Sequence, residues 1–322
     1  MNPSTVERNE WAIQTHGLTK RFDGFTAVDD VDVRVKRGEI FGFLGPNGAG
    51  KTTTIRMMLG ILTPTAGTVD VLGIPVTERP REIRPRVGYM AQSFSLYDDL
   101  TVMQNLRFYG RSYGLTGSDL QERIGDALER TDLAGREKVR TRSLSGGWRQ
   151  RLALNAAIIH SPELVFLDEP TAGVDPTSRR AFWDLLYDLV GEGVTVFVTT
   201  HYMDEAEHCH RLAFIQRGRI IVEGSPAQIK QDEIEGQVLE IDCDEPNRAR
   251  AILAEIEPLD EVTHYGAKLH AIAEGVEEMV PRITDALNEA GLQVHAMDVI
   301  QPSLEDVFIA KMKDAAESRP QA

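Results

Sequence analysis

One stretch decides the fold: Gly45-Pro46-Asn47-Gly48-Ala49-Gly50-Lys51-Thr52, followed directly by Thr53. It matches the pattern G-x-x-x-x-G-K-[ST], in which glycines let backbone N–H groups wrap around phosphates at the start of a helix. Lys51 then offers a positive charge to the β- and γ-phosphates, and Thr52 offers a hydroxyl to a bridging Mg²⁺. Segment 39–44 is predicted to be a strand and segment 53–59 a helix, which is the setting the motif requires. We therefore expect residues 45–53 to bind ATP.

Two carboxylates follow a second apolar segment. Residues 164–167 are Leu-Val-Phe-Leu, and Asp168 and Glu169 come directly after them. At the end of a buried strand, one carboxylate can bind a metal ion while the other accepts a proton from water. Alone, such a pair is often only a helix cap. Together with the glycine-rich loop, the pair predicts that Asp168 binds Mg²⁺ and that Glu169 is the general base.

A third motif lies between the other two. Leu144-Ser145-Gly146-Gly147-Trp148 opens an apolar helix with a hydroxyl and two glycines. A helix N-terminus with free N–H groups is an anion-binding site. Because the glycine-rich loop already supplies one such site, we expect Ser145, Gly146 and Gly147 to face ATP that another molecule holds.

The remaining pattern alternates strands and helices. Strand, helix and strand at 164–167, 178–190 and 194–198 favour a parallel sheet. Segment 96–142 has helical spacing and a possible capping box from Ser118 to Gln121. The segments that read as hairpins are 13–35, with a turn at Asp23-Gly24, and 212–222.

Composition narrows the class of protein. The 322 residues are 42% hydrophobic and 26% charged, which is ordinary for a globular protein. A formal net charge of -15 argues against nucleic-acid binding, and we assign arginine clusters at 79–86 and 136–142 to solvated faces or subunit contacts. We expect no transmembrane helix and no signal peptide, because apolar runs stay below about 18 residues. His208-Cys209-His210 is poorly spaced for one ion, so we expect it to be structural.

The order of motifs across about residues 11–230 resembles that of ABC ATPases. To the three motifs it adds Gln92, the run Thr171-Ala172-Gly173-Val174-Asp175 and His201. The resemblance implies that Phe22 stacks on adenine, that Gln92 senses Mg²⁺ and contacts a membrane subunit, and that His201 is the γ-phosphate switch. It also implies a head-to-tail dimer in which Asp175 runs between the subunits. Trp148 departs from the glutamine usual at its position, and Phe22 from the frequent tyrosine.

The resulting fold prediction is α/β: a P-loop NTPase ABC cassette with a mixed sheet core, an antiparallel β subdomain and a helical subdomain, followed by a small α+β domain. The cassette is expected at 11–232, with its helical subdomain at about 93–150. Segments at 237–299 predict a βαββαβ order within an accessory domain at 235–313. Ser303 to Asp306 fits a capping box before a last helix, and residues 314–322 are expected to be a flexible tail.

The C-terminal run 302–308, Pro-Ser-Leu-Glu-Asp-Val-Phe, resembles ATPases of the ABC-2 exporter group, the daunorubicin-resistance or multidrug type. The resemblance implies an ATP-hydrolysing subunit that drives export through a separate ABC-2 type permease and lies on the cytoplasmic face of the cell membrane. Two alternatives remain at this point: a non-transport ABC ATPase acting as an assembly factor, and an accessory domain that regulates or stabilises the dimer. Phe22, Gln92 and His201, taken singly, are also compatible with purely structural roles.

Overall fold

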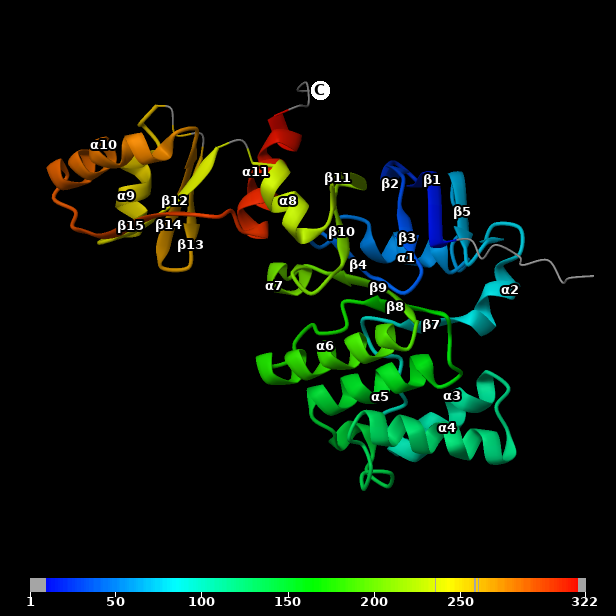
Figure 1. Ribbon diagram of the computed structural model, residues 1–322. Coiled ribbons are helices and arrows are strands. Elements are labelled where there is room, and N and C mark those ends of the chain that lie inside the picture. The colour runs from blue at the N-terminus through cyan, green and yellow to red at the C-terminus, as the bar shows by residue number, and fades with distance from the viewer. Residues whose placement is uncertain (1–9, 235, 258, 260, 318–322) are drawn as a thin grey trace, which may run out of the picture. The chain divides into compact units, whose positions relative to one another are not determined.

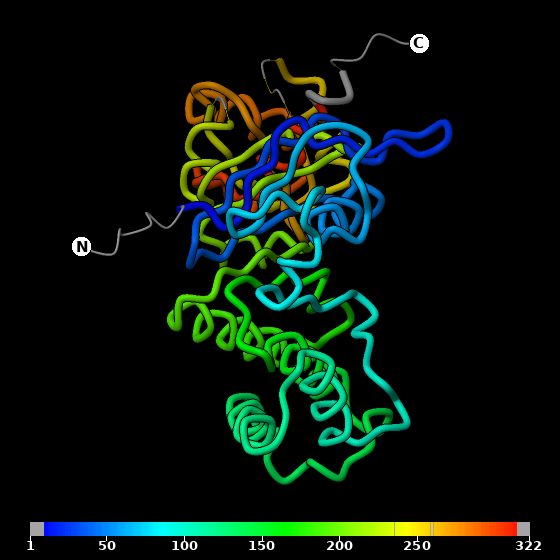
Figure 2. The backbone as a smooth tube through the Cα atoms, turned by 90° about the vertical axis from the view of Figure 1, so that its right-hand side faces the viewer, coloured from blue at the N-terminus to red at the C-terminus, as the bar shows by residue number. Residues whose placement is uncertain are grey.

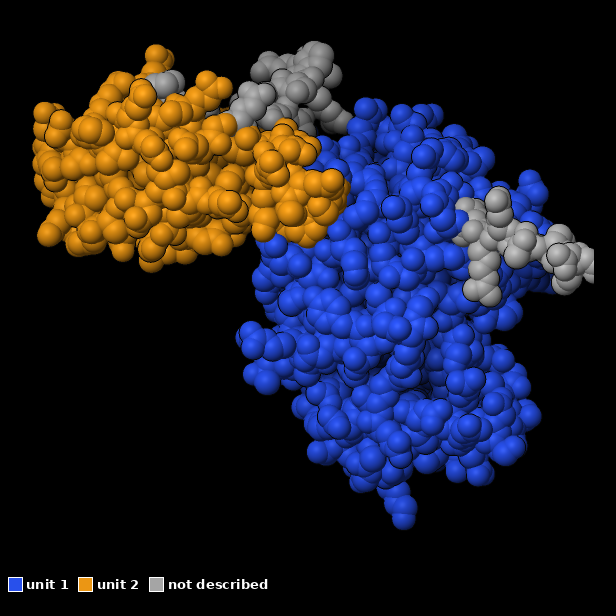
Figure 3. Space-filling model, viewed as in Figure 1, with its two compact units in different colours: residues 1–223 blue, residues 224–322 orange. Residues whose placement is uncertain are grey.

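The computed structural model describes residues 10–317, apart from 235, 258 and 260. The chain divides into two compact units at Glu223–Gly224 (Figure 3). The sequence predicts that the cassette ends at Asp232. Helix α8 instead packs against α11 in the second unit, which moves the division upstream.

A six-stranded sheet forms the centre of the first unit, with strand order β11-β10-β4-β9-β8-β7 (Figure 1). The four strand pairings β10–β4, β4–β9, β9–β8 and β8–β7 are parallel. All residues of β4, β8 and β9 are buried, as parallel strands covered on both faces require. The strand bounds are β4 Ile40–Leu44, β7 Val87–Met90, β8 Leu164–Asp168, β9 Thr195–Thr200, β10 Arg211–Gln216 and β11 Arg219–Gly224.

An antiparallel sheet accompanies this core. Its long strand β1 pairs with β2, β3 and β5, and β6 pairs with β5. The expected hairpin is present, and Figure 2 shows the β1–β2 turn as a dark-blue projection. The strand bounds are β1 Trp11–Phe22, β2 Phe25–Val31, β3 Arg34–Lys36, β5 Ala66–Val71 and β6 Ile74–Pro75.

Helices α3, α4 and α5 form the helical part around a core that includes Leu106, Leu128 and Leu152. The expected capping box at Ser118 is wrong. Helix α4 already begins at Gly117 after Thr116, so Ser118 lies inside the first turn. A capping box does start α3, where Thr101 and Gln104 exchange hydrogen bonds. The helices of the first unit are α1 Lys51–Met58, α2 Pro80–Ile83, α3 Val102–Ser112, α4 Gly117–Arg130, α5 Gly146–Ile158, α6 Pro176–Gly191 and α7 Met203–Ala206, with 3₁₀ turns at Arg84–Arg86 and Thr141–Ser143.

The second unit has the expected βαββαβ order. Its sheet runs β13-β14-β12-β15, with all three pairings antiparallel, and α9 and α10 pack on one apolar face. Its elements are α8 Pro226–Asp232, β12 Gln237–Cys243, α9 Pro246–Leu253, β13 Glu261–Tyr265, β14 Lys268–Ala273, α10 Val276–Glu289, β15 Val294–Ile300 and α11 Leu304–Glu317.

The last helix begins as the sequence indicates. Ser303 Oγ accepts a hydrogen bond from Asp306 N at 3.2 Å, and Asp306 Oδ2 accepts from Ser303 N at 2.8 Å. Helix α11 continues to Glu317, past residue 314 where the flexible tail was predicted to start, and residues 318–322 lie outside the described part; the flexible tail stays a prediction. Within the described residues, no helix is both long and apolar enough to cross a membrane.

Candidate active site for ATP

The glycine-rich loop joins β4 to α1, and two of its glycines adopt backbone angles that other residues rarely adopt. Gly48 and Gly50 have φ angles of 80° and 115°, which L side chains rarely adopt. A Cβ atom on Gly50 would lie 2.6 Å from the carbonyl oxygen of Ala27. On Gly45 it would lie 2.2 Å from the carbonyl oxygen of Ile215. The loop is therefore packed closely against the backbone at Ala27 and Ile215.

A cavity of about 420 Å³ lies beside this loop. It is open to solvent and combines backbone, cationic, hydroxyl and carboxylate groups, as a triphosphate site needs. Its lining residues are Phe25, Ala27, Asn47, Gly48, Gly50, Lys51, Thr52, Thr53, Gln92 and Glu169.

Glu169 is the centre of the polar groups at this cavity. Its Oε1 lies 3.0 Å from Lys51 Nζ, and its Oε2 accepts a hydrogen bond from Gln92 Nε2 at 3.0 Å. His201 Nδ1 lies 3.4 Å from the same Oε2. The structure thus brings together four residues that span 150 positions of the sequence, from Lys51 to His201, as expected for one site.

The backbone at Glu169 is held in an unusual conformation. Its φ is 49°, in the left-handed region that costs a non-glycine residue about 1 kcal/mol or more. Its N–H is fixed by Thr199, whose carbonyl and hydroxyl oxygens lie 3.1 Å and 3.0 Å away. This turn directs the carboxylate toward the cavity instead of continuing the line of β8.

Lys51 is folded back on the loop that carries it. It is only 5% exposed, and its Nζ donates to the carbonyl oxygens of Gly45 at 2.6 Å and Pro46 at 3.2 Å. With Glu169, these contacts compensate a buried ammonium group. A phosphate offers the same oxygen acceptors with more negative charge, so Lys51 can exchange its present partners for a nucleotide.

Asp168 and Thr52 fit a hard cation. Asp168 is 1% exposed, and its Oδ1 accepts hydrogen bonds from Thr52 Oγ1 at 3.1 Å and Thr199 Oγ1 at 2.9 Å. A carboxylate and a hydroxyl are oxygen ligands of the kind that Mg²⁺ takes alongside phosphate oxygens and water. Gln92, the other expected metal ligand, faces the cavity but donates to Glu169.

The aromatic side chain of the cavity differs from the expected one. Phe22 and Phe25 are partners across the β1–β2 turn and are 47% and 60% exposed. Phe25 lines the cavity, whereas Phe22 lies under Lys20 Nζ at 5.3 Å from the ring centroid. Phe22 and Phe25 form an exposed aromatic pair at the β1–β2 turn, and sequence analysis singled out only Phe22.

The segment 144–147 begins α5 away from this cavity. Ser145 is its N-cap, with no side-chain capping bond, and Ser145 and Gly146 are exposed. A Cβ on Gly147 would lie 2.5 Å from Ser178 Oγ, so glycine is required for close packing against α6. None of these three residues lines the cavity beside Lys51.

Trp148 is enclosed by two arginines. The guanidinium carbons of Arg136 and Arg151 lie 4.2 Å and 4.9 Å from its ring centroid, within cation–π distance. Arg151 also donates to the carbonyl oxygen of Thr131 at 3.0 Å. Trp148 therefore links Arg136, in the loop after α4, to Arg151, in the second turn of α5.

The His208-Cys209-His210 run has separate structural partners. His208 Nδ1 lies 2.8 Å from Tyr187 Oη, and His210 Nδ1 accepts from Ile40 N at 3.1 Å. Burial strongly raises the pKa of the Cys209 thiol, which disfavours a thiolate ligand. Among the described residues, no group of three or more His, Cys, Asp or Glu side chains could hold a metal ion.

The geometry defines a P-loop nucleotide-binding cassette, and comparisons with known proteins give its family. Residues 28–172 match the family "ABC transporter", and residues 224–312 match "ATP-binding protein DrrA1-3-like, C-terminal domain". The chain is 38% identical over 299 residues to "Nod factor export ATP-binding protein I" of Cupriavidus metallidurans, covering 92% of this chain and 96% of that relative. The chain belongs to the family of ABC transporter ATP-binding proteins.

Two further matches agree. "Probable multidrug ABC transporter ATP-binding protein YbhF" of Escherichia coli is 50% identical over 221 residues, which are 69% of this chain; the chain spans only 38% of that relative's length. A structure described as the dimeric post-hydrolysis state of the ATP-binding cassette MJ0796, bound to ADP and Pi, has a TM-score of 0.61 and 26% identity. The structural match covers 66% of this chain and 98% of the MJ0796 chain. The predicted fold class and family are confirmed.

Proposed function

We propose that the chain is the ATP-hydrolysing subunit of an ABC-2 type exporter. The observation that carries this proposal is the meeting of Lys51, Gln92 and His201 on the Glu169 carboxylate, at the mouth of a cavity beside the phosphate loop. The matches to export ATP-binding proteins and to the DrrA1-3-like C-terminal domain support the exporter assignment.

The proposed chemistry is in-line attack of water on the γ-phosphate, which breaks the bond from the γ-phosphorus to the bridging oxygen and releases ADP and phosphate. Glu169 accepts the proton of the attacking water, and Lys51 stabilises negative charge on the β- and γ-phosphates. His201 and Gln92, both within 3.4 Å of Glu169 Oε2, orient the water and the γ-phosphate. Mg²⁺ held by Thr52, Asp168 and the Gln92 side chain would neutralise phosphate charge.

A head-to-tail dimer completes the proposed site. Ser145, Gly146 and Gly147 begin a helix whose free N–H groups suit an anion, yet they do not line the cavity of their own chain. We propose that they contact the γ-phosphate of ATP held by a second copy. Asp175, the exposed N-cap of α6, would lie in the loop between the copies.

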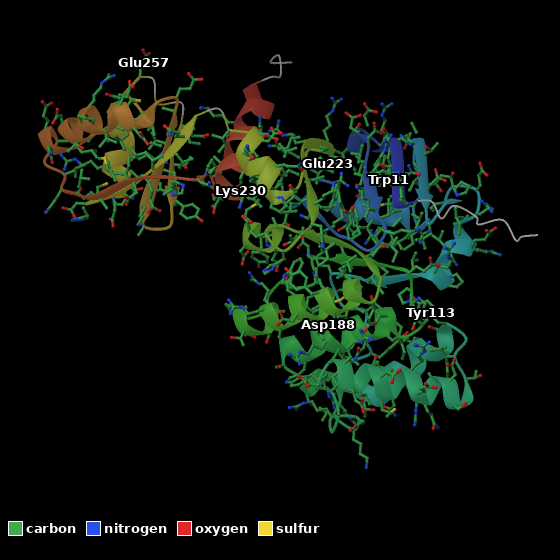
Figure 4. The ribbon with its side chains drawn as sticks, in the orientation of Figure 1. Trp11, Tyr113, Asp188, Glu223, Lys230 and Glu257 are labelled. Atoms are coloured by element: carbon green, nitrogen blue, oxygen red, sulfur yellow. The ribbon has the colours of Figure 1, made fainter. Side chains whose placement is uncertain are left out.

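An exposed aromatic surface suits the membrane partner. Tyr97 and Phe108 are 47% and 44% exposed and pack edge to face at 4.7 Å. A nearby cavity of about 500 Å³ includes Tyr113, labelled in Figure 4, and Ile61, which is 63% exposed. Large exposed aromatic and aliphatic groups mark protein contacts. We propose that the permease binds here, which would place the subunit at the cytoplasmic face of the membrane.

The assembly-factor alternative has no support among the comparisons, whose named relatives are export and multidrug transporter proteins. A regulatory or dimer-stabilising role of the second unit stays a prediction. Deleting residues 224–322 and finding unchanged ATPase activity and dimerisation would count against it.

The experiment that tests the proposal uses Glu169→Gln, which should bind ATP but hardly hydrolyse it and so hold the complex closed. The tagged variant is isolated with ATP from membranes of the native host. The control is Lys51→Ala, which should bind ATP too weakly to form the closed dimer. We expect a polytopic membrane protein with about six helices of spanning length, enriched only with Glu169→Gln. Only soluble partners would contradict the exporter assignment.

A further inference from the structure

Glu205 is a buried carboxylate outside the cavity. It lies on α7, one turn after His201, and is 1% exposed. Its Oε1 accepts a hydrogen bond from the hydroxyl of Thr171, which follows Glu169 by two residues. Burying a carboxylate costs free energy unless cationic or hydrogen-bonding groups pair with it, so the groups that surround Glu205 determine that cost.

Arg179 faces this carboxylate from α6. Its Nε lies 3.5 Å from Glu205 Oε1, and its Nη1 lies 3.0 Å from Asp204 Oδ2. In the part of the chain that the structure describes, neither Arg179 Nε nor Glu205 Oε2 has a hydrogen-bond partner. The pair is thus near contact but incompletely bonded, and a small shift of α6 toward α7 would complete it.

The guanidinium group also touches the turn that carries His201. Its central carbon lies 4.3 Å from the ring centroid of Tyr202, and the Tyr202 and His201 rings lie 4.1 Å apart. His201 is in turn 3.4 Å from Glu169 Oε2. One arginine therefore supports the His201–Tyr202 turn through a ring contact and two carboxylates.

The backbone connects the same arginine to the loop at Asp175. The Arg179 N–H donates to the carbonyl oxygen of Asp175 at 2.9 Å, and Asp175 Oδ1 accepts from Ser178 N at 3.0 Å. Helix α6 begins directly after Asp175, so a displacement of this loop moves Arg179 with the first turn of the helix. Within a helical turn such a displacement is transmitted nearly rigidly.

We infer that Arg179 is a positioning residue that orients His201 for ATP hydrolysis and makes this orientation depend on the loop at Asp175. The inference rests on the proposed function. Arg179 is not among the residues that line the cavity, and its effect passes through Tyr202, Asp204 and Glu205.

The test is a double-mutant cycle between Arg179→Met and His201→Ala, read as kcat and KM for Mg-ATP. We expect Arg179→Met to lower kcat by roughly 10- to 50-fold while KM changes less than about twofold, since ATP contacts are intact. In the His201→Ala background the same substitution should cost less than about twofold, because the residue it positions is already gone. Arg179→Lys, which keeps the charge but not the planar fork, should recover part of the loss.

Arg180→Met is the matched control, because Arg180 is an exposed arginine next to Arg179 on the same helix. Its kcat should stay near wild type. Equal fold losses from Arg179→Met in both backgrounds, or an unchanged kcat, would overturn the inference. If Arg179→Met does not fold, Tyr202→Leu, which removes the ring contact, enters the same cycle with the same expectations. An inactive wild-type protein would instead contradict the proposed function, so the two failures are distinct.

Discussion

Glu169 in the first unit and Asp306 in the second are both buried carboxylates beside an imidazole, but their surroundings differ. Glu169 is 7% exposed and meets Lys51, Gln92 and His201 at the wall of a cavity. Asp306 is 2% exposed and meets His270 Nδ1 at 2.7 Å, between β14 and α11. A buried charge that opens on a cavity can act on a ligand, whereas one enclosed by two elements holds them together. The predictions below separate these two uses.

The largest expected effect is on nucleotide affinity. Lys51→Ala removes the only ammonium group that lines the described cavity and leaves Glu169 without its cationic partner. We expect ATP affinity to fall by about 100-fold or more, since charge-assisted contacts to phosphate are strong. Calorimetric titration measures the change, and Lys36→Ala, at an exposed strand position, is the control. Near wild-type affinity would contradict the phosphate role of Lys51.

The next effect concerns stability and belongs to the second unit. His270→Phe leaves the Asp306 carboxylate buried without its imidazole partner, which typically costs about 3 kcal/mol. The matched control is His295→Phe, whose contact with Asp244 is 3.0 Å but exposed, and it should cost less than about 1 kcal/mol. Denaturant unfolding measures both. Equal losses would show that burial is not what distinguishes the pairs.

The same pair sets a pH window. Burial lowers the pKa of His270, but the Asp306 and Glu240 carboxylates outweigh it and raise the pKa above 6.5 overall. Burial raises the pKa of Asp306, but hydrogen bonds from His270 and Ser303 outweigh it and lower the pKa below 3.8. The His270 contribution is complete below pH 6.5 and is lost as pH rises through the raised pKa. The Asp306 contribution is complete above pH 3.8 and is lost as pH falls through the lowered pKa. The stability gap to His270→Phe should therefore be widest between these limits.

A smaller effect tests the aromatic pair. Replacing both Phe22 and Phe25 by alanine should weaken ATP binding by about tenfold, because a base stacked on a ring contributes on the order of 1–3 kcal/mol. Tripolyphosphate, which has no base, should bind the variant as it binds the wild type. Equal losses for both ligands would assign the pair a structural role, and the two single variants would show which ring carries the contact.

The smallest effect is expected at Trp148. Trp148→Gln restores the residue usual at this position and removes the ring between Arg136 and Arg151. Each cation–π contact contributes about 0.5–1 kcal/mol, so the first unit should lose about 1–2 kcal/mol. Urea unfolding measures the loss, and Trp148→Phe, which keeps a ring face, should lose less. A more stable glutamine variant would contradict the linking role of Trp148.

Much of the fold followed from local sequence signals, but some elements depended on distant partners. The order of the motifs predicted the buried strands β4, β8 and β9. Alternating apolar residues predicted the βαββαβ order of the second unit. Strands β5 and β7 were not predicted. Strand β7 has only four residues, one of which is Gly88. Its partner strand β8 lies more than seventy residues further along the chain. The Ser118 cap failed because Thr116 and Gly117 already begin the helix.

The candidate site shows the same limit. The types and spacing of Lys51, Thr52, Asp168 and Glu169 were enough for the sequence to propose them as site residues, and the structure places them close to one another. Thr199 was missed although it bonds both Asp168 and the Glu169 backbone, because a threonine at the end of an apolar strand has no distinctive pattern. Phe25 was missed because only the turn geometry brings it to the cavity.

The most direct test of the account is the rate of phosphate release by Glu169→Gln at saturating Mg-ATP, measured beside Glu163→Gln. Glu163 is a half-exposed carboxylate that pairs with Arg37 and Arg86 away from the cavity. A general base contributes about 10²- to 10⁴-fold, so kcat of Glu169→Gln should fall by that factor while ATP still binds and Glu163→Gln stays near wild type. Wild-type turnover in Glu169→Gln would contradict the assignment of the base and, with it, the central claim about this site.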